Sequence, residues 1–506
     1  MLRNIKRIGG ICLTTTALIH LPLWAAGGHG EEATPPSMSP AATQVDHEAE
    51  LFGPDPSYED KPYNTDAQLN IYGGKREVEN PRPLLELGRP IYEAGPLSPP
   101  GHGLGRKNPT DHAFSLYGDW RTAIAYNDKG LVETGELATR LNLEADWKFT
   151  GTERLHAAFR PLDQDGDFTR CEFSGDTPAD CKDNTDLTPD SFFFEGDLGA
   201  ISAGISDRYS SFDLPIALGK MPLILQNGIW LDDFATGAAV TLPALNSPSL
   251  DISNMDITFM ALVDDVSSGG MVEANGNIAE HNANIYAITS FIEANEGYWE
   301  LGWGYTDGEG VLDDQSYHNA SVAFTKRYGG WLSNSVRLIH NWGQDRLNGA
   351  RQTADGTLLL IENSLITSKP LTLIPYLNLF AGFDRPQSLA RDPGAGGVLK
   401  NTGINFETDG LTGFPTLDAS ANNTYGAALG VEYLFGLDRQ IVVELATVQT
   451  REDAASRAIP GEQYALGLRY QQNIDRAWLF RIDAMAGSRK GLEDIGGIRF
   501  EIRRKF

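Results

Sequence analysis

The densest group of candidate metal ligands is an acidic cluster in the segment DQDGD. Every second position of this segment is an aspartate: Asp163, Asp165 and Asp167. Hard oxygen ligands at alternate positions suit Ca²⁺. The spacing is not that of an EF-hand, because Gly166 occupies the fourth position of the loop and not the sixth. Blocks of like charge are usually solvated loops. We therefore predict an acidic surface loop, with a calcium site as the alternative and no other cofactor.

Enzyme motifs do not accompany this cluster. The sequence has no Gly-x-Ser-x-Gly elbow, no His-Glu-x-x-His pair and no Walker loop. Its histidines outside the N-terminal segment show no recurring local partner that would mark a catalytic pair. These are His112, His156, His281, His318 and His340. We predict that the protein is not an enzyme.

Charged residues at every second position of apolar segments form a second candidate group. If each such segment is a strand of a barrel, these side chains line the lumen, where mixed charges hold water and set ion preference through the local field. The alternative is that they pair across strands and only rigidify the wall. The residues assigned to the lumen are Arg121, Arg140, Glu144, Asp146, Lys148, His156, Arg160, Arg337, Glu432, Glu444, Arg469, Arg481 and Asp483.

Long alternating segments must position these residues. Residues 137–149 alternate apolar and polar side chains throughout, whereas strands of soluble proteins have a typical length of about 5–6 residues and tilted membrane strands need about 9–11. After the N-terminal region no window provides the ~18–20 apolar residues of a transmembrane helix. The same alternation recurs at 120–126, 255–263, 285–293, 331–341, 371–383, 425–435, 440–450, 464–470 and 478–486.

The connections between these segments alternate in length. Short turns are expected at 150–153, 295–297, 328–330, 368–370, 436–438 and 473–476, and long polar loops at 162–189, 264–281, 343–356, 386–423 and 451–461. Short turns on one rim and long loops on the other are typical of a transmembrane barrel. The sequence therefore predicts an all-β, antiparallel up-and-down barrel of about 18 strands, with about 16 as the alternative.

The last segment of the chain has the same alternation. Ile498, Phe500, Ile502 and the terminal Phe506 share one face. This segment resembles the closing strand of bacterial outer-membrane β-barrels, which the barrel-assembly machinery recognises, although Arg504 stands where an apolar residue is usual. Aromatic residues near strand ends fit the two interfacial girdles of such barrels. They are Trp120, Tyr126, Trp147, Phe149, Tyr298, Trp299, Trp331, Trp342, Tyr433, Phe435, Tyr470 and Trp478.

A constriction is predicted in residues 206–233. Within it, PIALGKMPLILQNGIWLDD resembles in outline the strand and inward loop of outer-membrane porins and alginate-export-like barrels. The resemblance implies that Lys220, Asp232 and Asp233 narrow the pore. A strand followed by a surface loop is the alternative.

The termini and cysteines indicate export. Residues 1–26 read as a signal peptide, 27–110 as an extended or disordered segment that could plug the barrel, and 111–506 as the barrel itself. Cys171 and Cys181 lie close together in a polar stretch, and an oxidising compartment favours a disulfide between them.

Function and partners follow from these expectations. The formal charge of -27 argues against nucleic acid as a partner. We predict a bacterial outer-membrane porin-like channel for passive diffusion of ions and small hydrophilic solutes. Its expected partners are outer-membrane lipids, the assembly machinery, the solutes and further copies in a homotrimer. The alternatives are a polysaccharide-export barrel, for which Arg121, Arg140, Arg160 and Arg481 would form an anion path, and a barrel sheath or adhesin with a partner protein.

Overall fold

A computed structural model describes residues 81–88 and 101–506, apart from 165, 176–177, 274–276, 280, 282, 346–351, 409, 437, 452–456 and 458. The predicted signal peptide lies outside the described residues, as does most of the predicted N-terminal segment. Within the described part of the chain, no helix is long and apolar enough to cross a membrane.

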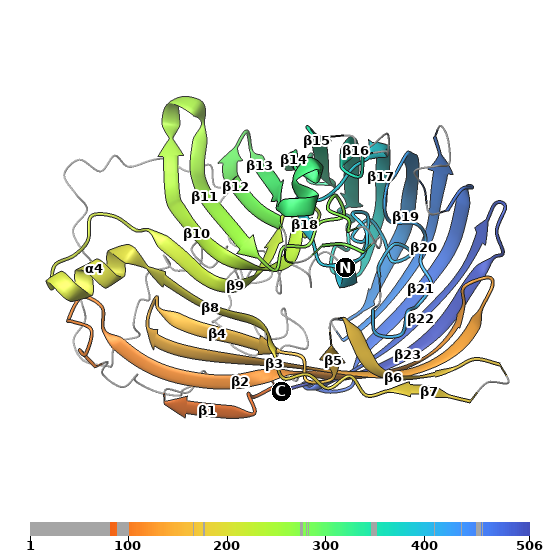
Figure 1. The fold of residues 1–506 in the computed structure, drawn as a ribbon, viewed down its shortest axis with the longest axis horizontal. Coiled ribbons are helices and arrows are strands. Elements are labelled where there is room, and N and C mark those ends of the chain that lie inside the picture. Colours follow the sequence, from red (N-terminus) through yellow and green to blue (C-terminus); the bar gives the residue numbers. More distant parts are fainter. Residues whose placement is uncertain are drawn as a thin grey trace, which may run out of the picture.

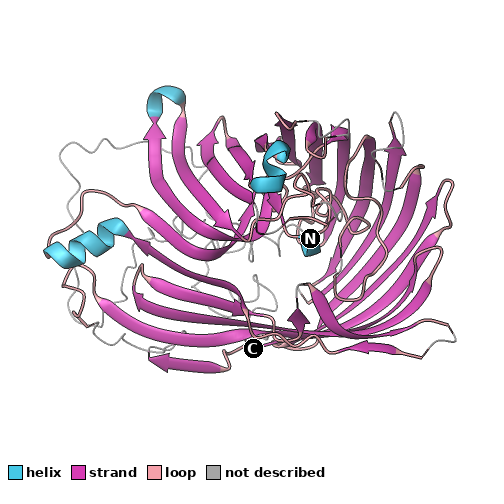
Figure 2. Ribbon diagram, in the orientation of Figure 1, coloured by secondary structure: helices cyan, strands magenta, loops and turns pink. Residues whose placement is uncertain are grey.

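Eighteen antiparallel strands close into a barrel, as predicted from the sequence (Figures 1 and 2). The barrel strands are β2 (Thr110–Asp128), β3 (Glu133–Thr150), β4 (Arg154–Phe159), β8 (Pro189–Asp197), β9 (Pro215–Leu225), β10 (Leu231–Ser247), β11 (Ile252–Asp264), β12 (Ala283–Ala294), β13 (Gly297–Gly308), β14 (Tyr317–Tyr328), β15 (Leu332–Trp342), β16 (Asp355–Leu365), β17 (Leu373–Arg385), β19 (Thr424–Phe435), β20 (Arg439–Thr450), β21 (Gln463–Asn473), β22 (Trp478–Arg489) and β23 (Ile495–Lys505).

The last strand closes the barrel against the first. Asp119 of β2 is opposite Lys505 of β23, and Asp128 is opposite Gly496. Beyond β23, the main chains of Gly118 and Phe506 exchange two hydrogen bonds, of 2.9 and 3.0 Å. The C-terminal segment is therefore the closing strand that its alternation predicted.

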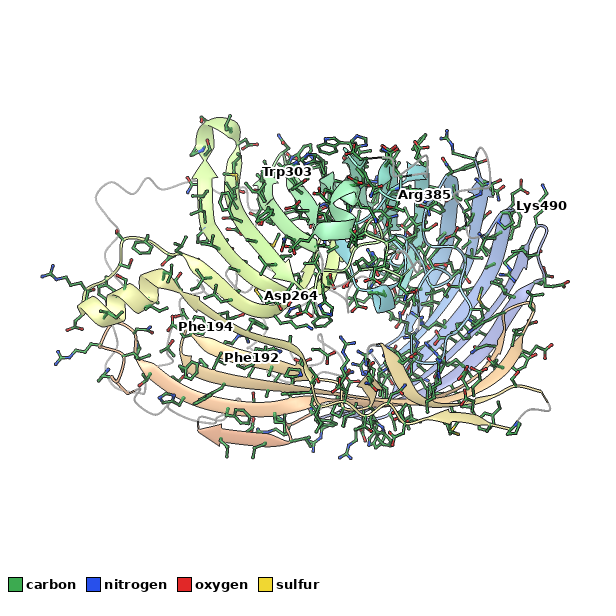
Figure 3. The ribbon with its side chains drawn as sticks, in the orientation of Figure 1. Phe192, Phe194, Asp264, Trp303, Arg385 and Lys490 are labelled. Atoms are coloured by element: carbon green, nitrogen blue, oxygen red, sulfur yellow. A yellow bond between two sulfur atoms is a disulfide. The ribbon has the colours of Figure 1, made fainter. Side chains whose placement is uncertain are left out.

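Exposure alternates along the strands as a barrel in a membrane requires. On β3, Leu137 is 44% exposed and Trp147 48%, whereas Ala138 between them is 1% exposed. On other strands Phe192 and Trp303, labelled in Figure 3, are 55% and 42% exposed. One face of each strand thus carries apolar side chains outward, and the other carries the charged and small side chains inward.

Two rims differ in the length of their connections. At the rim that contains Phe506, which we call the C-terminal rim, most connections are short; the exception is the segment 198–214, which contains helix α4 (Leu198–Ser206). The 3-10 helix η2 (Pro248–Leu250) forms another turn of this rim. The opposite rim, which we call the long-loop rim, carries the connections 160–188, 265–282, 343–354, 386–423 and 451–462. It also carries the 3-10 helix η3 (Gly310–Gln315). The predicted sorting of short turns and long loops is confirmed.

Four short strands extend the sheet beyond the barrel wall or lie in the long loop 160–188. β1 (Leu85–Gly88) pairs with the N-terminal part of β2. β5 (Asp163–Gln164), β6 (Asp167–Phe173) and β7 (Asp180–Lys182) belong to the long loop 160–188, and β6 pairs with the N-terminal part of β3. Cys171 and Cys181 form the predicted disulfide between β6 and β7.

Two elements fold into the barrel. The first is the turn 226–230 at the tip of the β9–β10 hairpin, which we call the hairpin tip. The second is the connection 386–423, which we call the lumen loop; it includes β18 (Ala390–Arg391) and the 3-10 helix η4 (Pro393–Ala395). β18 pairs in parallel with Leu231 and Asp232 at the base of the tip. The buried apolar core therefore lies inside the barrel and includes Trp230, Leu389, Leu399, Phe406 and Leu417.

The prediction of an inward loop over residues 206–233 was wrong for most of that segment. Pro215–Leu225 is β9, a strand of the wall that pairs with both β8 and β10. Only the hairpin tip enters the lumen. The segment 214–224 is strand-like in sequence, but a strand there would have made the predicted number of strands odd, so a loop was expected.

Candidate functional site

Arginines on neighbouring strands form a row on the inner wall. Strand register sets their positions: Arg469 of β21 is opposite Asp483 of β22, and Asp483 is opposite Arg499 of β23. On the next two strands, Arg121 of β2 is opposite Arg140 of β3. We call the following six residues the arginine row: Arg469, Arg481, Arg499, Arg121, Arg140 and Arg160.

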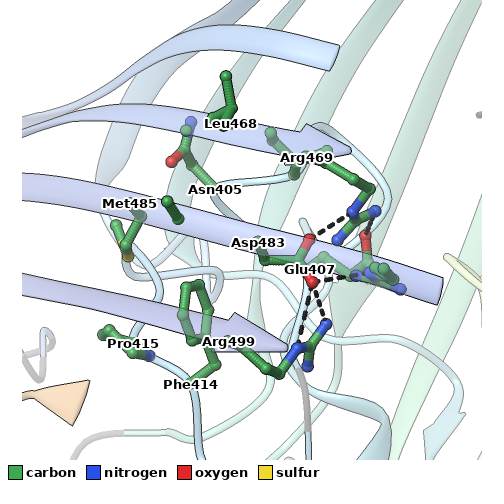
Figure 4. Close-up of a pocket in the computed structure, with 13 residues that line it drawn as sticks. Asn405, Glu407, Phe414, Pro415, Leu468, Arg469, Asp483, Met485 and Arg499 are labelled. Atoms are coloured by element: carbon green, nitrogen blue, oxygen red, sulfur yellow. Dashed lines mark hydrogen bonds and ion pairs between the residues drawn. The ribbon is translucent and has the colours of Figure 1, made fainter. Parts of the chain in front are cut away.

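One end of this row is a cluster of ion pairs, shown in Figure 4. Asp483 accepts from three arginines: Arg469 Nε at 2.6 Å, Arg481 Nε at 2.7 Å and Arg499 Nη2 at 2.5 Å. Glu407 of the lumen loop contacts two of the same arginines, with Oε2 2.7 Å from Arg469 Nη1 and Oε1 3.5 Å from Arg481 Nη2. We call Arg469, Arg481 and Arg499 the arginine cradle. A small pocket beside it is lined by the cradle and Asp483 and by Asn405, Glu407 and Phe414 of the lumen loop.

The other end of the row is less completely paired. Arg121 forms a bidentate pair with Glu501, with distances of 3.1 and 2.7 Å. Arg160 lies 3.1 Å from Asp190 and 3.4 Å from Asp163. Arg140 stacks 5.1 Å from the centre of the Phe168 ring, and no carboxylate among the described residues forms an ion pair with it. A cation on the lumen side without a paired acid can attract a passing anion.

The lumen loop is held against the wall by a buried glutamate. Glu444 of β20 is fully buried, and its carboxylate accepts from the main-chain N–H groups of Ile404 and Asn405 at 2.9 Å. Tyr376 of β17 donates to the same carboxylate at 2.5 Å. Since Ile404 and Asn405 precede Glu407 by three and two positions, these bonds also fix the main chain that presents Glu407.

Electrostatics keep Glu407 ionised. Partial burial alone would raise the pKa of this carboxyl, but the charges of Arg469 and Arg481 and the hydrogen bond from Arg469 outweigh it and lower the pKa below the usual 4.5. Its side chain is 31% exposed. Glu407 is therefore an anion that both contacts the arginine cradle and faces the water of the lumen.

The hairpin tip reaches strands on a distant part of the wall. Trp230 is completely buried, and its Nε1 donates to Asn319 Oδ1 of β14 at 2.8 Å. Gln226 Oε1 accepts from Ser321 of β14 at 2.6 Å and from Arg337 of β15. Because β10 is separated from β14 by three strands in the sheet, the tip must lie across the lumen.

The three residues predicted for the constriction lie on the β9–β10 hairpin. Lys220 of β9 pairs with Asp265 at 3.2 Å. Asp232 of β10 forms an ion pair with Lys400 of the lumen loop, and Asp233 accepts from the main-chain N–H of Ser267 at 2.7 Å. Asp232 therefore meets the lumen loop, whereas Lys220 and Asp233 contact the connection 265–282. Lys220 also acts electrostatically on Asp190, the partner of Arg160, and so lies near that end of the arginine row.

Glu144 and Asp146 lie on β3 nearer the C-terminal rim. Asp146 accepts from Tyr117 at 2.6 Å and lies 2.8 Å from His156 Nδ1. Glu144 is opposite Tyr117 in the strand register. From Arg140 to Asp146 the strand advances six positions, about 20 Å at ~3.3 Å per residue, so these acids form a separate polar group.

Two of the three predicted calcium ligands lie within the described residues. Asp163 accepts from Arg160 at 3.4 Å and from the Gly166 N–H at 3.0 Å, Asp167 begins β6, and Asp165 lies outside the described residues. Elsewhere, ligand atoms of Asp264, Asp265 and His281 lie within 4.8 Å of one another. Lys220 already places its ammonium group beside Asp265, so we assign no metal there.

Sequence reasoning missed three members of this site. Arg499 and Glu501 lay on the polar face of the predicted closing strand but were not assigned to the lumen. Glu407 was not singled out, because it lies in a polar loop whose inward course has no local signal. Arg469 and Asp483 were assigned to the lumen, and their inward position here agrees with the strand period.

No protein-family model matches the chain, and no curated protein matches its sequence. Among solved structures, Acinetobacter baumannii OccAB4 is similar with a TM-score of 0.51 at 10% sequence identity, over 78% of this chain and 98% of that chain. Pseudomonas aeruginosa OccK2 (OpdF) is similar with a TM-score of 0.50 at 11% identity, over 77% and 97%. With its closed wall and outward apolar face, the chain has the fold of outer-membrane β-barrel porins.

Proposed function

We propose that this protein is a porin-like channel for passive diffusion of ions and small hydrophilic solutes, with a preference for small anions. The observation that carries the proposal is the arginine row on the inner wall of the closed barrel. Guanidinium groups present paired donors that match carboxylates and other planar anions. The driving force is the gradient of the solute, and no cofactor is needed.

The elements inside the barrel favour small solutes over a polymer. The hairpin tip contacts β14 across the lumen, and the lumen loop contacts β20 and β21. Two elements therefore occupy part of the lumen, which favours small solutes over a polymer. We therefore prefer a small-solute channel to a polysaccharide-export barrel, for which the arginines would have to guide a continuous chain.

Planar-bilayer recording tests the proposal. The mature protein, refolded and inserted, is expected to give discrete conductance steps in KCl and a reversal potential in a salt gradient that favours chloride. Vesicles should swell faster with a small monocarboxylate than with a cation of equal size. A folded and inserted barrel that carries no current would overturn the proposal, and passage of an anionic polymer would favour the export alternative.

The contribution of the row is tested at Arg140, the member without an ion pair among the described residues. A unit charge about 4 Å from a passing ion is worth ~1 kcal/mol even at the dielectric constant of water, which is roughly fivefold in equilibrium. R140Q should therefore lower the chloride-to-potassium permeability ratio by roughly fivefold. The matched control is K490Q at the long-loop rim, where Lys490 is 72% exposed, and it should change the ratio little (Figure 3).

Partners other than the solute follow from the barrel. The apolar outer face is proposed to contact outer-membrane lipids, and the closing strand is proposed to be recognised by the assembly machinery. The predicted homotrimer is tested by the same recordings: a trimer that inserts as one unit should close in three steps of equal size, whereas a monomer should close in one.

A further inference from the structure

Among the described residues, the arginine cradle binds a carboxylate that does not come from the barrel wall. Asp483 comes from the wall, on the strand between those of Arg469 and Arg499. Glu407 comes from the lumen loop and reaches Arg469 and Arg481 from the lumen side (Figure 4). The two acids are bound to the same guanidinium groups, but only Glu407 belongs to an element that is not part of the wall.

Exposure separates the two carboxylates. The side chain of Asp483 is 6% exposed, whereas that of Glu407 is 31% exposed. Asp483 is therefore an internal component of the wall, with arginines around it. Glu407 occupies the side of the cradle that lumen water reaches, which is where a dissolved anion would arrive.

The charge balance depends on Glu407. Glu407 places a negative charge beside the guanidinium groups of Arg469 and Arg481 and so lowers the net positive charge of the cradle by one unit. The neighbouring Arg121 and Glu501 are already matched with each other. In a partly desolvated site a change of one unit charge has a large effect on the affinity for an anion.

The position of Glu407 is also prearranged. Glu444 holds the N–H groups of Ile404 and Asn405, and Leu417 donates its N–H to Asn405 O at 2.9 Å. These contacts fix the loop on both sides of the turn without using the Glu407 side chain. The carboxylate is thus presented to the cradle by a scaffold that does not depend on it.

We propose that Glu407 is a specificity-determining residue that occupies the place of a solute carboxylate on Arg469 and Arg481. By holding these donors and cancelling one positive charge, it weakens the binding of acidic solutes and lets them pass instead of remaining bound. The inference rests on the proposed channel function. It adds that a carboxylate within the chain competes with the carboxylate of the solute.

The test is E407Q, which keeps the size of the side chain and removes its charge. Single-channel KCl current is measured with increasing sodium succinate as the probe. We expect the concentration of succinate for half-maximal block to fall about tenfold, and the reversal potential in a KCl gradient to shift toward chloride. The matched control is E462Q at the long-loop rim, where Glu462 pairs with Lys490 at 3.5 Å, and it should resemble the wild type.

A second variant, E407C, restores the charge chemically. Since Cys171 and Cys181 are joined in a disulfide, the thiol introduced by E407C is the intended target of a thiol reagent in the mature channel. Reaction with a negatively charged methanethiosulfonate should return the block by succinate toward the wild-type value, and a neutral reagent should not. This comparison uses one folded protein and so separates charge from folding.

Three outcomes would contradict the inference. Equal block in the wild type and E407Q would show that Glu407 does not compete with the solute. A larger conductance of E407Q with unchanged selectivity would show that it only holds the loop in place. Absence of current from the wild type and every variant, all correctly inserted, would overturn the proposed channel function itself and the inference with it.

Discussion

Asp483 and Arg499 lie opposite each other on β22 and β23, with Arg499 Nη2 2.5 Å from Asp483 Oδ2. Both side chains are almost completely buried, and Arg469 and Arg481 contact the same carboxylate. Removing one partner of a buried pair is costly, by about 3–5 kcal/mol, because the other charge remains buried. We expect D483N to lower the free energy of unfolding by about 3 kcal/mol, measured by urea titration of tryptophan fluorescence in lipid vesicles.

An exposed ion pair provides the control for this prediction. Lys490 and Glu462 are 3.5 Å apart at the long-loop rim, and Lys490 is 72% exposed. Such surface pairs contribute about 0–1 kcal/mol. E462Q should therefore unfold within about 1 kcal/mol of the wild type. If D483N were as stable as E462Q, the cluster around Asp483 would not stabilise the barrel.

Gly302 of β13 makes room for Trp230 of the hairpin tip. A Cβ atom at Gly302 would lie 2.7 Å from two carbon atoms of the Trp230 ring. We expect G302A to displace the tip, to lower the free energy of unfolding by about 1–3 kcal/mol through overpacking, and to increase the single-channel conductance. G151A is the matched control, because nothing lies within 4 Å of a Cβ there. Loss of stability without a change in conductance would show that the tip does not narrow the path.

The strands could be predicted because their pattern is local. Along 137–149 successive side chains face lipid and lumen in turn, so apolar and polar residues alternate in the sequence itself. Even the unusual Arg504 fits this pattern, since its guanidinium lies 5.5 Å from the centre of the Trp478 ring at the C-terminal rim. An arginine at the membrane interface can bury its stem and stack on an aromatic ring, so it does not contradict a closing strand.

The course of the lumen loop could not be predicted, because its contacts are distant in sequence. Glu407 meets Arg469 and Arg481 across more than sixty positions, and a polar loop has the same composition outside the barrel as inside it. β9 was misread for a different reason. Its residues are strand-like, but a strand there would have made the predicted number of strands odd, and the sequence does not show that this segment pairs with strands on both sides.

The disulfide between Cys171 and Cys181 stabilises the long loop 160–188, which lies outside the barrel wall. It joins β6 to β7, and β6 pairs with residues 135–139 in the N-terminal part of β3. We expect the double variant C171S/C181S to insert and conduct like the wild type. Trypsin should cleave it after Arg170 or Lys182 faster by a factor of about 5–30, as loss of ~2 kcal/mol of loop order implies. Reduced wild-type protein should behave like the variant, and equal cleavage rates in all three samples would contradict the prediction.

The pH dependence of ion selectivity should show whether the ionised carboxylate of Glu407 contributes to it. The Arg469 and Arg481 charges lower the pKa of this carboxyl below 4.5, so its contribution is fully present above that value and is lost as the pH falls through the lowered pKa. The difference in reversal potential between the wild type and E407Q should therefore be constant from neutral pH down to 4.5 and should disappear below it. Because other carboxylates titrate equally in both proteins, the difference isolates Glu407. A difference that already vanished between neutral pH and 4.5 would mean that burial, and not the arginines, controls this group.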